Sequence, residues 1–260
     1  MNSLQSIKQA SALILLSGSI LFTGCKKDGG TSLPAAAVST KVAFGIKTDN
    51  TTLNLVAANS KNAFGISAAS SILWSSGIAN IKKFEFEAKR NGTKISIETK
   101  NLTNVDLFAL SPSLISVTLD SGTYKEIEVK VQLAKSATAI PVTLKGTFSA
   151  SNGAKIPVEL YVNEDLTIKM ESENVVIDNS KDVLNMVNLH LDKILATITA
   201  KEFENAVMTD NKIIISSSSN ENLYNKIKVN VPHSGDNKTE KVEKGEIEKK
   251  EKNEKNENGG

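Results

Sequence analysis

Polar and apolar residues alternate one by one through the middle of the chain, and this pattern limits the possible folds more than any other feature. Residues 41–47, 84–90 and 94–98 each alternate in this way. A period of two places one face of a β-strand on a core and the other in water, as antiparallel sheets allow. Asn91 and Gly92 separate the last two segments, and Asn-Gly is the dipeptide most typical of a two-residue hairpin turn. The sequence therefore predicts a hairpin over residues 84–98.

Similar segments follow, separated by turn sequences rich in Gly, Asn, Asp and Ser. Many short strands at regular spacing are typical of a sandwich or barrel. We predict an all-β fold, an antiparallel β-sandwich of immunoglobulin or transthyretin type, that occupies residues 41–235 as one domain. The further predicted strands are 114–119, 124–133, 141–150, 155–162, 166–170, 175–177 and 213–217. Short helical segments are expected at 192–195, 200–207 and 222–229.

The N-terminal segment has the pattern of a secretory signal. An uncharged run over residues 10–22 has the length of a signal-peptide hydrophobic region and is short for a membrane span. Residues 21–25 (LFTGC) resemble the lipobox of bacterial lipoproteins, although Phe22 replaces the usual aliphatic residue. The resemblance implies that residues 1–24 are a lipoprotein signal peptide, removed by cleavage after Gly24, and that Cys25 carries a diacylglyceryl group. The alternative is an ordinary secretory signal followed by a chance Cys.

A lipidated Cys25 would hold the protein at a membrane through acyl chains such as palmitate, because each buried CH₂ contributes ~0.8 kcal/mol. Lys26 follows Cys25 where Asp would retain an enteric lipoprotein at the inner membrane, which favours the outer membrane. Residues 26–28 (KKD) are also similar to the charged start of surface-exposed lipoproteins of Bacteroidota. We expect an outer-membrane lipoprotein, at the cell surface or on the periplasmic face, with residues 25–40 as a flexible stalk.

The C-terminal segment, residues 236–260, contains seven Lys and eight Asp or Glu, with Val242 and Ile247 as its only apolar side chains. So little apolar surface cannot offset the chain entropy lost on folding. The sequence therefore predicts a disordered charged tail, either a solvated segment or an electrostatic contact to cell-wall polymer or a partner.

Several segments are arranged as in a known family. Residues 105–107 (VDL) precede a run in which Leu119, Gly122, Tyr124 and Ile127 fit L-x-x-G-x-Y-x-x-I. This order is similar to the β-sandwich lipoprotein domains known as domain of unknown function 4382, over about residues 70–200. The family pattern has a basic residue directly after the Ile, whereas here the basic residue is Lys130, two places further on. The resemblance implies a scaffold and no particular activity.

Two of these residues have a physical interpretation without the family. Gly122 gives the backbone the freedom that a tight turn needs. Tyr124 beside it is expected to pack its ring inward while its hydroxyl finds a backbone acceptor, as Tyr at a sandwich corner does.

Composition excludes several kinds of site. One Cys excludes an intrachain disulfide framework, two His exclude a His-rich metal centre, and a net charge of +2 argues against a nucleic-acid partner. A nucleophilic triad would need His190, which the alternation instead places on a strand facing the surface. Acidic residues are numerous enough to supply the carboxylate pair of a glycoside hydrolase, but no spacing in the sequence indicates which two would form it.

Two weak candidate sites remain open. Asp178, Ser180 and Asp182 offer alternating oxygen ligands, as at the start of a calcium loop, against an Asx-type turn as the alternative. Trp74 is the one strong aromatic candidate for ligand binding, against a role in core packing. We expect a non-enzymatic, lipid-anchored envelope module without a cofactor, structural or interacting with envelope polysaccharide or protein. The alternatives are a glycan- or ligand-binding surface module and a carboxylate-dependent hydrolase.

Overall fold

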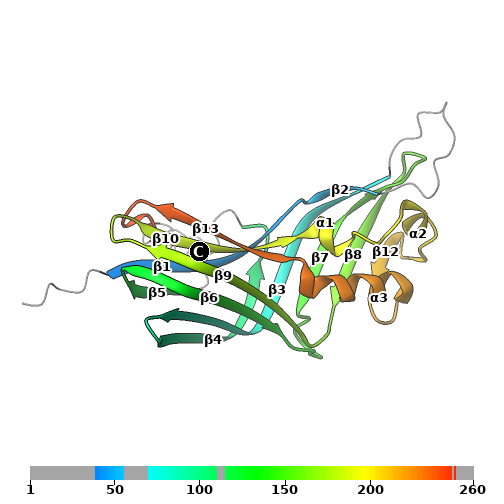
Figure 1. Cartoon of the computed structure of the whole chain (residues 1–260). Coiled ribbons are helices and arrows are strands. Elements are labelled where there is room, and N and C mark those ends of the chain that lie inside the picture. The colour runs from blue at the N-terminus through cyan, green and yellow to red at the C-terminus, as the bar shows by residue number, and fades with distance from the viewer. Residues whose placement is uncertain (1–38, 56–69, 110–114, 248, 250–260) are drawn as a thin grey trace, which may run out of the picture. The chain divides into compact units, whose positions relative to one another are not determined.

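The computed structural model describes residues 39–55, 70–109, 115–247 and 249 (Figure 1). The predicted signal peptide, the lipidation site Cys25 and nearly all of the predicted stalk therefore lie outside the described residues.

Strands make up most of the described chain. In chain order they are β1 (Ser39–Asp49), β2 (Thr52–Asn54), β3 (Ser71–Arg90), β4 (Thr93–Asp106), β5 (Ile115–Asp120), β6 (Gly122–Leu133), β7 (Val142–Ser149), β8 (Lys155–Val162), β9 (Leu166–Ile177), β10 (Asp182–His190), β11 (Met208–Thr209), β12 (Lys212–Ile215) and β13 (Gly235–Val242). The helices are α1 (Leu191–Ile194), α2 (Ala200–Glu204) and α3 (Glu221–Asn230), followed by the 3-10 turn η1 (Val231–His233).

The strands form two sheets. One has the order β13-β10-β1-β5, and the other has the order β11-β12-β8-β7-β3-β6-β9, with β2 and β4 also paired to β3. The predicted hairpin is confirmed, since β3 pairs with β4 and Asn91 and Gly92 form the turn with positive φ of 49° and 77°. Two pairs, β1 with β10 and β12 with β8, are parallel, whereas the sequence predicted an antiparallel sandwich.

Strand β3 organises the larger sheet because it is long enough to serve two sets of neighbours. Its first half pairs with β7 on one edge and with β2 on the other, and its second half pairs with β6 and β4. The register with β4 shifts between Ala79 and Ile81, where the neighbours change. The sheet thus has two wings that share β3.

The wing that contains the second half of β3 packs against the four-stranded sheet. The Phe44 ring of β1 lies 4.5 Å from the Phe86 ring and 6.0 Å from the Phe84 ring of β3, measured between centroids. At one side of this sandwich β13 lies against β9, where Asn237 Nδ2 donates a 3.3 Å hydrogen bond to Ser172 Oγ. The predicted all-β sandwich is confirmed.

The three helices lie beside the β7, β8 and β12 wing (Figure 1). The Phe203 ring of α2 stacks on the Phe148 ring of β7 with 5.3 Å between centroids. Thr199 and Glu202 form a capping box that satisfies backbone N–H groups at the start of α2. The predicted short helical segments near the C-terminal end are confirmed.

The prediction that disorder begins at residue 236 is wrong. Strand β13 pairs with β10 in an unbroken antiparallel register from Gly235 opposite Leu189 to Val242 opposite Asp182. Ile247, further along the same segment, is 2% exposed. The composition argument failed because main-chain hydrogen bonds to an adjacent strand do not require apolar side chains.

The corner predicted at Tyr124 is confirmed. The Tyr124 side chain is fully buried, and its hydroxyl donates a 2.9 Å hydrogen bond to the backbone oxygen of Asp120. The Arg90 guanidinium lies 5.5 Å from the centre of the Tyr124 ring and forms a 3.2 Å ion pair with the Asp120 carboxylate. Gly122 adopts φ of 149°, and a Cβ there would meet Arg90 Nη1 at 2.9 Å. The positive φ favours glycine at this corner, and the buried ring and its hydrogen bond account for the tyrosine.

Candidate functional site

The most organised group of polar side chains covers the outward face of four adjacent strands, which we call the charged face. It has four side chains from each strand, and pairing places them in rows across the sheet. Its members are Lys83, Glu85, Glu87 and Lys89 of β3, Lys94, Ser96, Glu98 and Lys100 of β4, Glu126, Glu128, Lys130 and Gln132 of β6, and Thr167, Lys169, Glu171 and Glu173 of β9.

Ion pairs connect this face within and between strands. Lys83 lies 2.9 Å from Glu98, Lys94 lies 2.6 Å from Glu87, and Lys89 lies 2.9 Å from Glu126, in each case between nitrogen and oxygen. Exposed pairs of this kind contribute little individually, about 0–1 kcal/mol each. The face is therefore mainly a pattern of compensated charge presented to solvent.

Glu128 differs from the other carboxylates because it is buried, with 6% of its surface exposed. It occupies the middle of the face, where it contacts Lys130 and lies 2.8 Å from the Lys169 ammonium. Burial alone would raise the pKa of Glu128, but hydrogen bonds from Lys130 and Lys169 outweigh it and lower this pKa to about 2. Glu128 is therefore a buried charge that depends on its two lysine partners.

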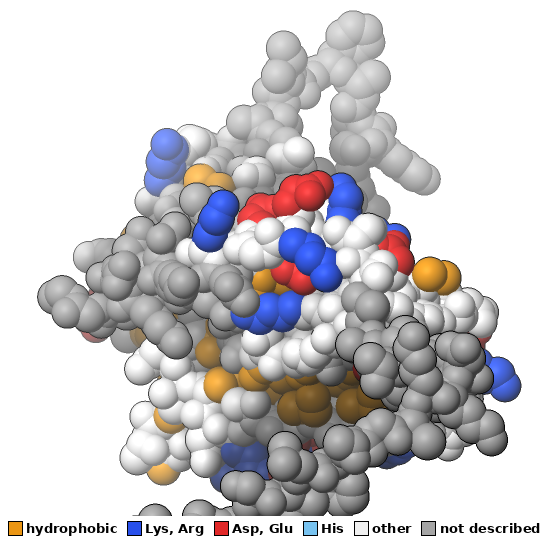
Figure 2. Space-filling model, turned by 90° about the vertical axis from the view of Figure 1, so that its left-hand side faces the viewer, with side chains coloured by type: hydrophobic (Ala, Val, Ile, Leu, Met, Phe, Trp, Pro, Cys, Tyr) orange, Lys and Arg blue, Asp and Glu red, His pale blue; other side chains and the backbone are white. Residues whose placement is uncertain are grey.

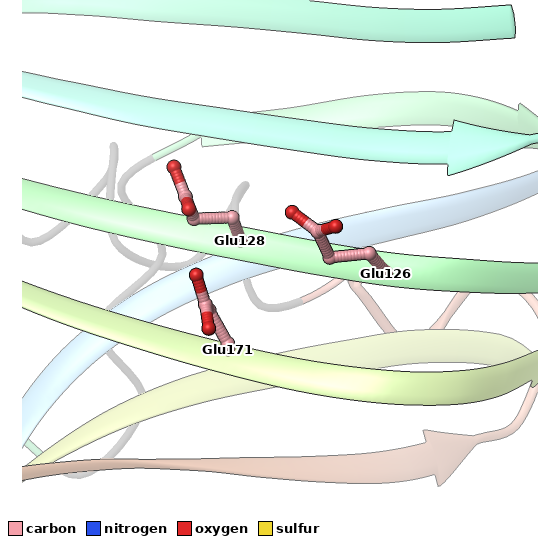
Figure 3. Close-up of side chains that lie close together, drawn as sticks. All are labelled: Glu126, Glu128 and Glu171. Atoms are coloured by element: carbon pink, nitrogen blue, oxygen red, sulfur yellow. The ribbon is translucent and has the colours of Figure 1, made fainter.

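Glu126, Glu128 and Glu171 form the one group of at least three acidic, His or Cys side chains within the described chain that are close enough to share a metal ion. Their nearest oxygens all lie within 4.8 Å of one another (Figure 3). Each carboxylate already has an ammonium partner, from Lys89, Lys130 or Lys169. Since three positive charges balance three negative ones, the cluster is explained as an ion-pair network.

His190 lies at the end of β10, where it joins three strands. Its Nδ1 lies 2.6 Å from Asp49 Oδ1 of β1, and its Nε2 contacts Asp236 Oδ2 of β13. The side chain is 13% exposed, so the prediction of a surface-facing His is wrong. Because both ring nitrogens are engaged by carboxylates, neither is available as the base of a nucleophilic triad.

We expect His190 to titrate above its ordinary pKa of 6.5. Burial lowers this pKa, but the hydrogen bonds and charges of Asp236 and Asp49 outweigh burial and raise it. A raised pKa contributes stability that is complete below the unfolded pKa and is lost as the pH rises through the folded one. His190→Gln should therefore cost about 1 kcal/mol at pH 5.5 and less at pH 9. NMR titration of His190, assigned through this variant, would contradict the interpretation if its midpoint lay at or below 6.5.

Trp74 is part of the core and not an exposed ligand platform. It lies on β3 with 2% of its surface exposed. Gly146 on the adjacent strand β7 leaves the space for it, because a Cβ at Gly146 would lie 3.0 Å from the Trp74 ring and 2.4 Å from the Leu73 backbone oxygen. A buried ring cannot stack on a sugar, so the candidate ligand-binding role of Trp74 is not supported.

The candidate calcium residues are engaged by other groups. Asp178 Oδ1 accepts a 3.0 Å hydrogen bond from the Ser180 N–H, which is the Asx-type turn considered as the alternative, and its other oxygen contacts the Lys241 ammonium. Asp182 Oδ2 accepts a 2.9 Å hydrogen bond from the backbone N–H of Gly245. The turn is confirmed, and these contacts explain the carboxylates without a cation.

An open hollow of about 620 Å³ lies beside the β3–β4 turn. Charged side chains line it, namely Lys89, Arg90, Lys94, Lys125, Glu126 and Glu173. The end of the molecule on the left of Figure 1 shows the same mixture, with Lys and Arg side chains among Asp and Glu side chains (Figure 2). Four of these side chains are basic and two are acidic, but Lys89, Arg90 and Lys94 are each paired with a carboxylate, so most of the positive charge of the hollow is already compensated.

Sequence reasoning did not identify the charged face. Its signal was present in the outward positions of the alternating segments, where residues 83–89 read Lys, Glu, Glu, Lys at every second position. Only the pairing register shows which of these charges are neighbours.

Comparison of the chain with protein-family models, with curated proteins and with solved structures gives no match. The resemblance to domain of unknown function 4382 remains a prediction from the sequence.

Proposed function

We propose that the chain is a lipid-anchored module of the bacterial outer membrane with a structural or interaction role and no catalytic activity. The absence of catalytic activity is proposed because two candidate acid–base groups of the described chain are already bound to other side chains. Both nitrogens of His190 and the buried carboxylate of Glu128 are occupied by partners within the protein. Catalytic acids and bases need access to a substrate, and these groups lack it.

The anchoring part depends on the sequence around Cys25. A hydrophobic region, small residues and then the only Cys of the chain match the lipobox order. None of the helices in the described ranges is long and apolar enough to cross a membrane. Acylation of Cys25 would provide membrane attachment by itself, because several acyl chains on one residue hold tightly.

The interaction role is favoured over the alternatives by the charged face. It is a broad sheet surface that presents side chains of both signs in a fixed register. The glycan-binding alternative depended on Trp74, which is buried. The hydrolase alternative requires two free carboxylates facing one cleft. Glu126 and Glu173 both line the open hollow, but Glu126 lies 2.9 Å from the Lys89 ammonium, and the clustered glutamates are paired with lysines on an open sheet face.

Replacing Cys25 tests the anchor. We expect Cys25→Ser to move the protein from the membrane fraction to the soluble fraction and to abolish labelling by a radioactive or alkyne-tagged palmitate. The matched control is Ser39→Cys combined with Cys25→Ser, which restores a thiol at the start of β1 but outside the lipobox. A Cys25→Ser protein that stays in the membrane fraction, or that is still acylated, would contradict the anchor.

A further inference from the structure

Strand β4 is an open edge of the sandwich. It runs for 14 residues and pairs only with β3 among the described strands. At the opposite side of the sandwich, the terminal strands β9 and β13 contact each other through Ser172 and Asn237. A long unpaired edge can accept a further strand through its main-chain groups.

The apolar residues of β4 are less buried than those of its neighbour. Ile95 and Ile97 point toward the core but remain half-buried, whereas Phe86 and Ala88 opposite them on β3 are fully buried. The core is therefore incompletely covered along this edge. A partner strand beside β4 would cover these two isoleucines.

The charged face ends at β4 in a self-complementary pattern. Glu98 is opposite Glu85, so one row of the face ends with two acidic side chains. Lys94 is opposite Lys89, so the row on the other side of Ser96 ends with two basic side chains. The acidic and basic row ends stand symmetrically about Ser96.

We propose that a second copy of this chain pairs with β4 edge to edge, antiparallel, with Ser96 opposite Ser96 of the second copy. This register places Lys94 opposite Glu98 of the other copy twice, and Ile95 opposite Ile97 twice. A two-fold axis perpendicular to the sheet keeps the buried faces of both copies on the same side. The row of one copy that ends in the acidic pair Glu85 and Glu98 then continues into the row of the other copy that ends in the basic pair Lys89 and Lys94.

Neighbouring registers are less favourable for electrostatic reasons. A two-fold axis at Ile97 places Lys94 opposite Lys100, and an axis at Glu98 places the Glu98 side chains opposite each other. Like charges directly opposite each other destabilise strand pairing. An axis at Thr99 would include Asn101, whose positive φ of 56° interrupts the regular strand. The Ser96 register uses residues 92–100, before this irregularity.

Cross-linking through an introduced Cys tests the register in the full chain. Residues opposite each other in an antiparallel pair have Cα atoms roughly 4.5–5.5 Å apart, which a disulfide can bridge. We expect Ser96→Cys to form a disulfide-linked dimer under mild oxidation. Lys100→Cys is the matched control on the same strand, because its two copies would lie eight residues apart, about 27 Å. The unsubstituted chain, whose only thiol is Cys25, gives the background.

Charge reversal tests the complementarity independently. Lys94→Glu and Glu98→Lys should each raise the dimer Kd about tenfold, because each creates two like-charge pairs. An equimolar mixture of the two variants should recover the original affinity, because both pairs again have opposite signs. Lys155→Glu makes the same charge change on the exposed start of β8, in the other wing of the sheet, and should leave the Kd unchanged. Sedimentation of the detergent-solubilised full chain measures these constants.

Two results would overturn the proposal. One is a Ser96→Cys protein that cross-links no more than the Lys100→Cys control or the background. The other is a mixture of the two charge-reversal variants that dimerises no better than either alone. Both measurements use protein already extracted from the membrane fraction or the soluble fraction, so they do not depend on whether Cys25 is acylated.

Discussion

Replacing Tyr124 by Ala should lower the free energy of unfolding by about 3–5 kcal/mol, the usual cost of removing a buried aromatic ring. For a domain of this size the melting temperature should fall by about 6–20 °C, since 1 kcal/mol corresponds to roughly 2–4 °C. The effect is expected to be large because the ring has no exposed surface and its hydroxyl also joins the corner to the Asp120 backbone. Thermal unfolding followed by circular dichroism measures it.

Tyr124→Phe separates the two contributions of this residue. It keeps the ring under the Arg90 guanidinium and removes the hydrogen bond to Asp120, so it should cost only about 1 kcal/mol. An unchanged melting temperature for Tyr124→Ala would contradict the corner assignment. A loss as large for Phe as for Ala would show that the hydroxyl, rather than the ring, provides most of the stabilisation.

Removing both lysine partners of Glu128 should produce the second large effect. Lys130→Met with Lys169→Met leaves a carboxylate that is 6% exposed without its two ammonium partners. An uncompensated buried charge is strongly destabilising, and we expect a loss of about 3 kcal/mol at pH 7. Met keeps much of the apolar stem of each lysine, so the lost charge is the main change. Chemical denaturation measures the loss.

The pH dependence of this effect has a definite sign. In the unsubstituted protein the pKa of Glu128 is about 2, below its ordinary value of 4.5, so its stabilising contribution is lost as the pH falls through this interval. In the double variant burial raises this pKa, so the penalty is relieved as the pH falls and the carboxylate becomes neutral. The difference in stability between the two proteins should therefore narrow from pH 7 to pH 3.

A third substitution provides the control. Glu128→Leu added to the double variant removes the unpaired charge and should restore most of the lost stability, because an apolar side chain can replace a buried ion pair at little cost. A triple variant as unstable as the double would contradict the role assigned to the charge. The role would also be contradicted if the difference in stability between the double variant and the original protein grew as the pH fell.

The hairpin at Asn91 and Gly92 and the Tyr124 corner could be predicted because each depends on residues close together in the chain. Asn and Gly tolerate the positive φ of the turn, and Tyr124 reaches Asp120 only four residues earlier. The alternation of residues 84–90 and 94–98 could be interpreted in the same way, because one face of each strand is more buried than the other. These are local properties that tertiary packing did not alter.

Strands β10 and β13 could not be predicted in the same way. Most residues of β10 are buried on both faces, so apart from Leu189 and His190 at its end the segment lacks a clear alternation, and β13 is polar at most positions. What makes β13 a strand is its neighbour, since eight consecutive residues pair with β10. Composition describes how much surface a segment can bury, but it does not describe the hydrogen-bonding edge that another segment offers.

The all-β class and the local turns could be predicted from the amino-acid order, because each follows from periodicity or from contiguous residues, and the lipidation site at Cys25 remains a prediction of the same kind. The tertiary structure alone decided which charges became neighbours: it buried Glu128 between Lys130 and Lys169 and placed His190 between Asp49 and Asp236. The reason is that ion pairs across a sheet depend on strand order and register, and a shift of one residue would move every side chain to the other face.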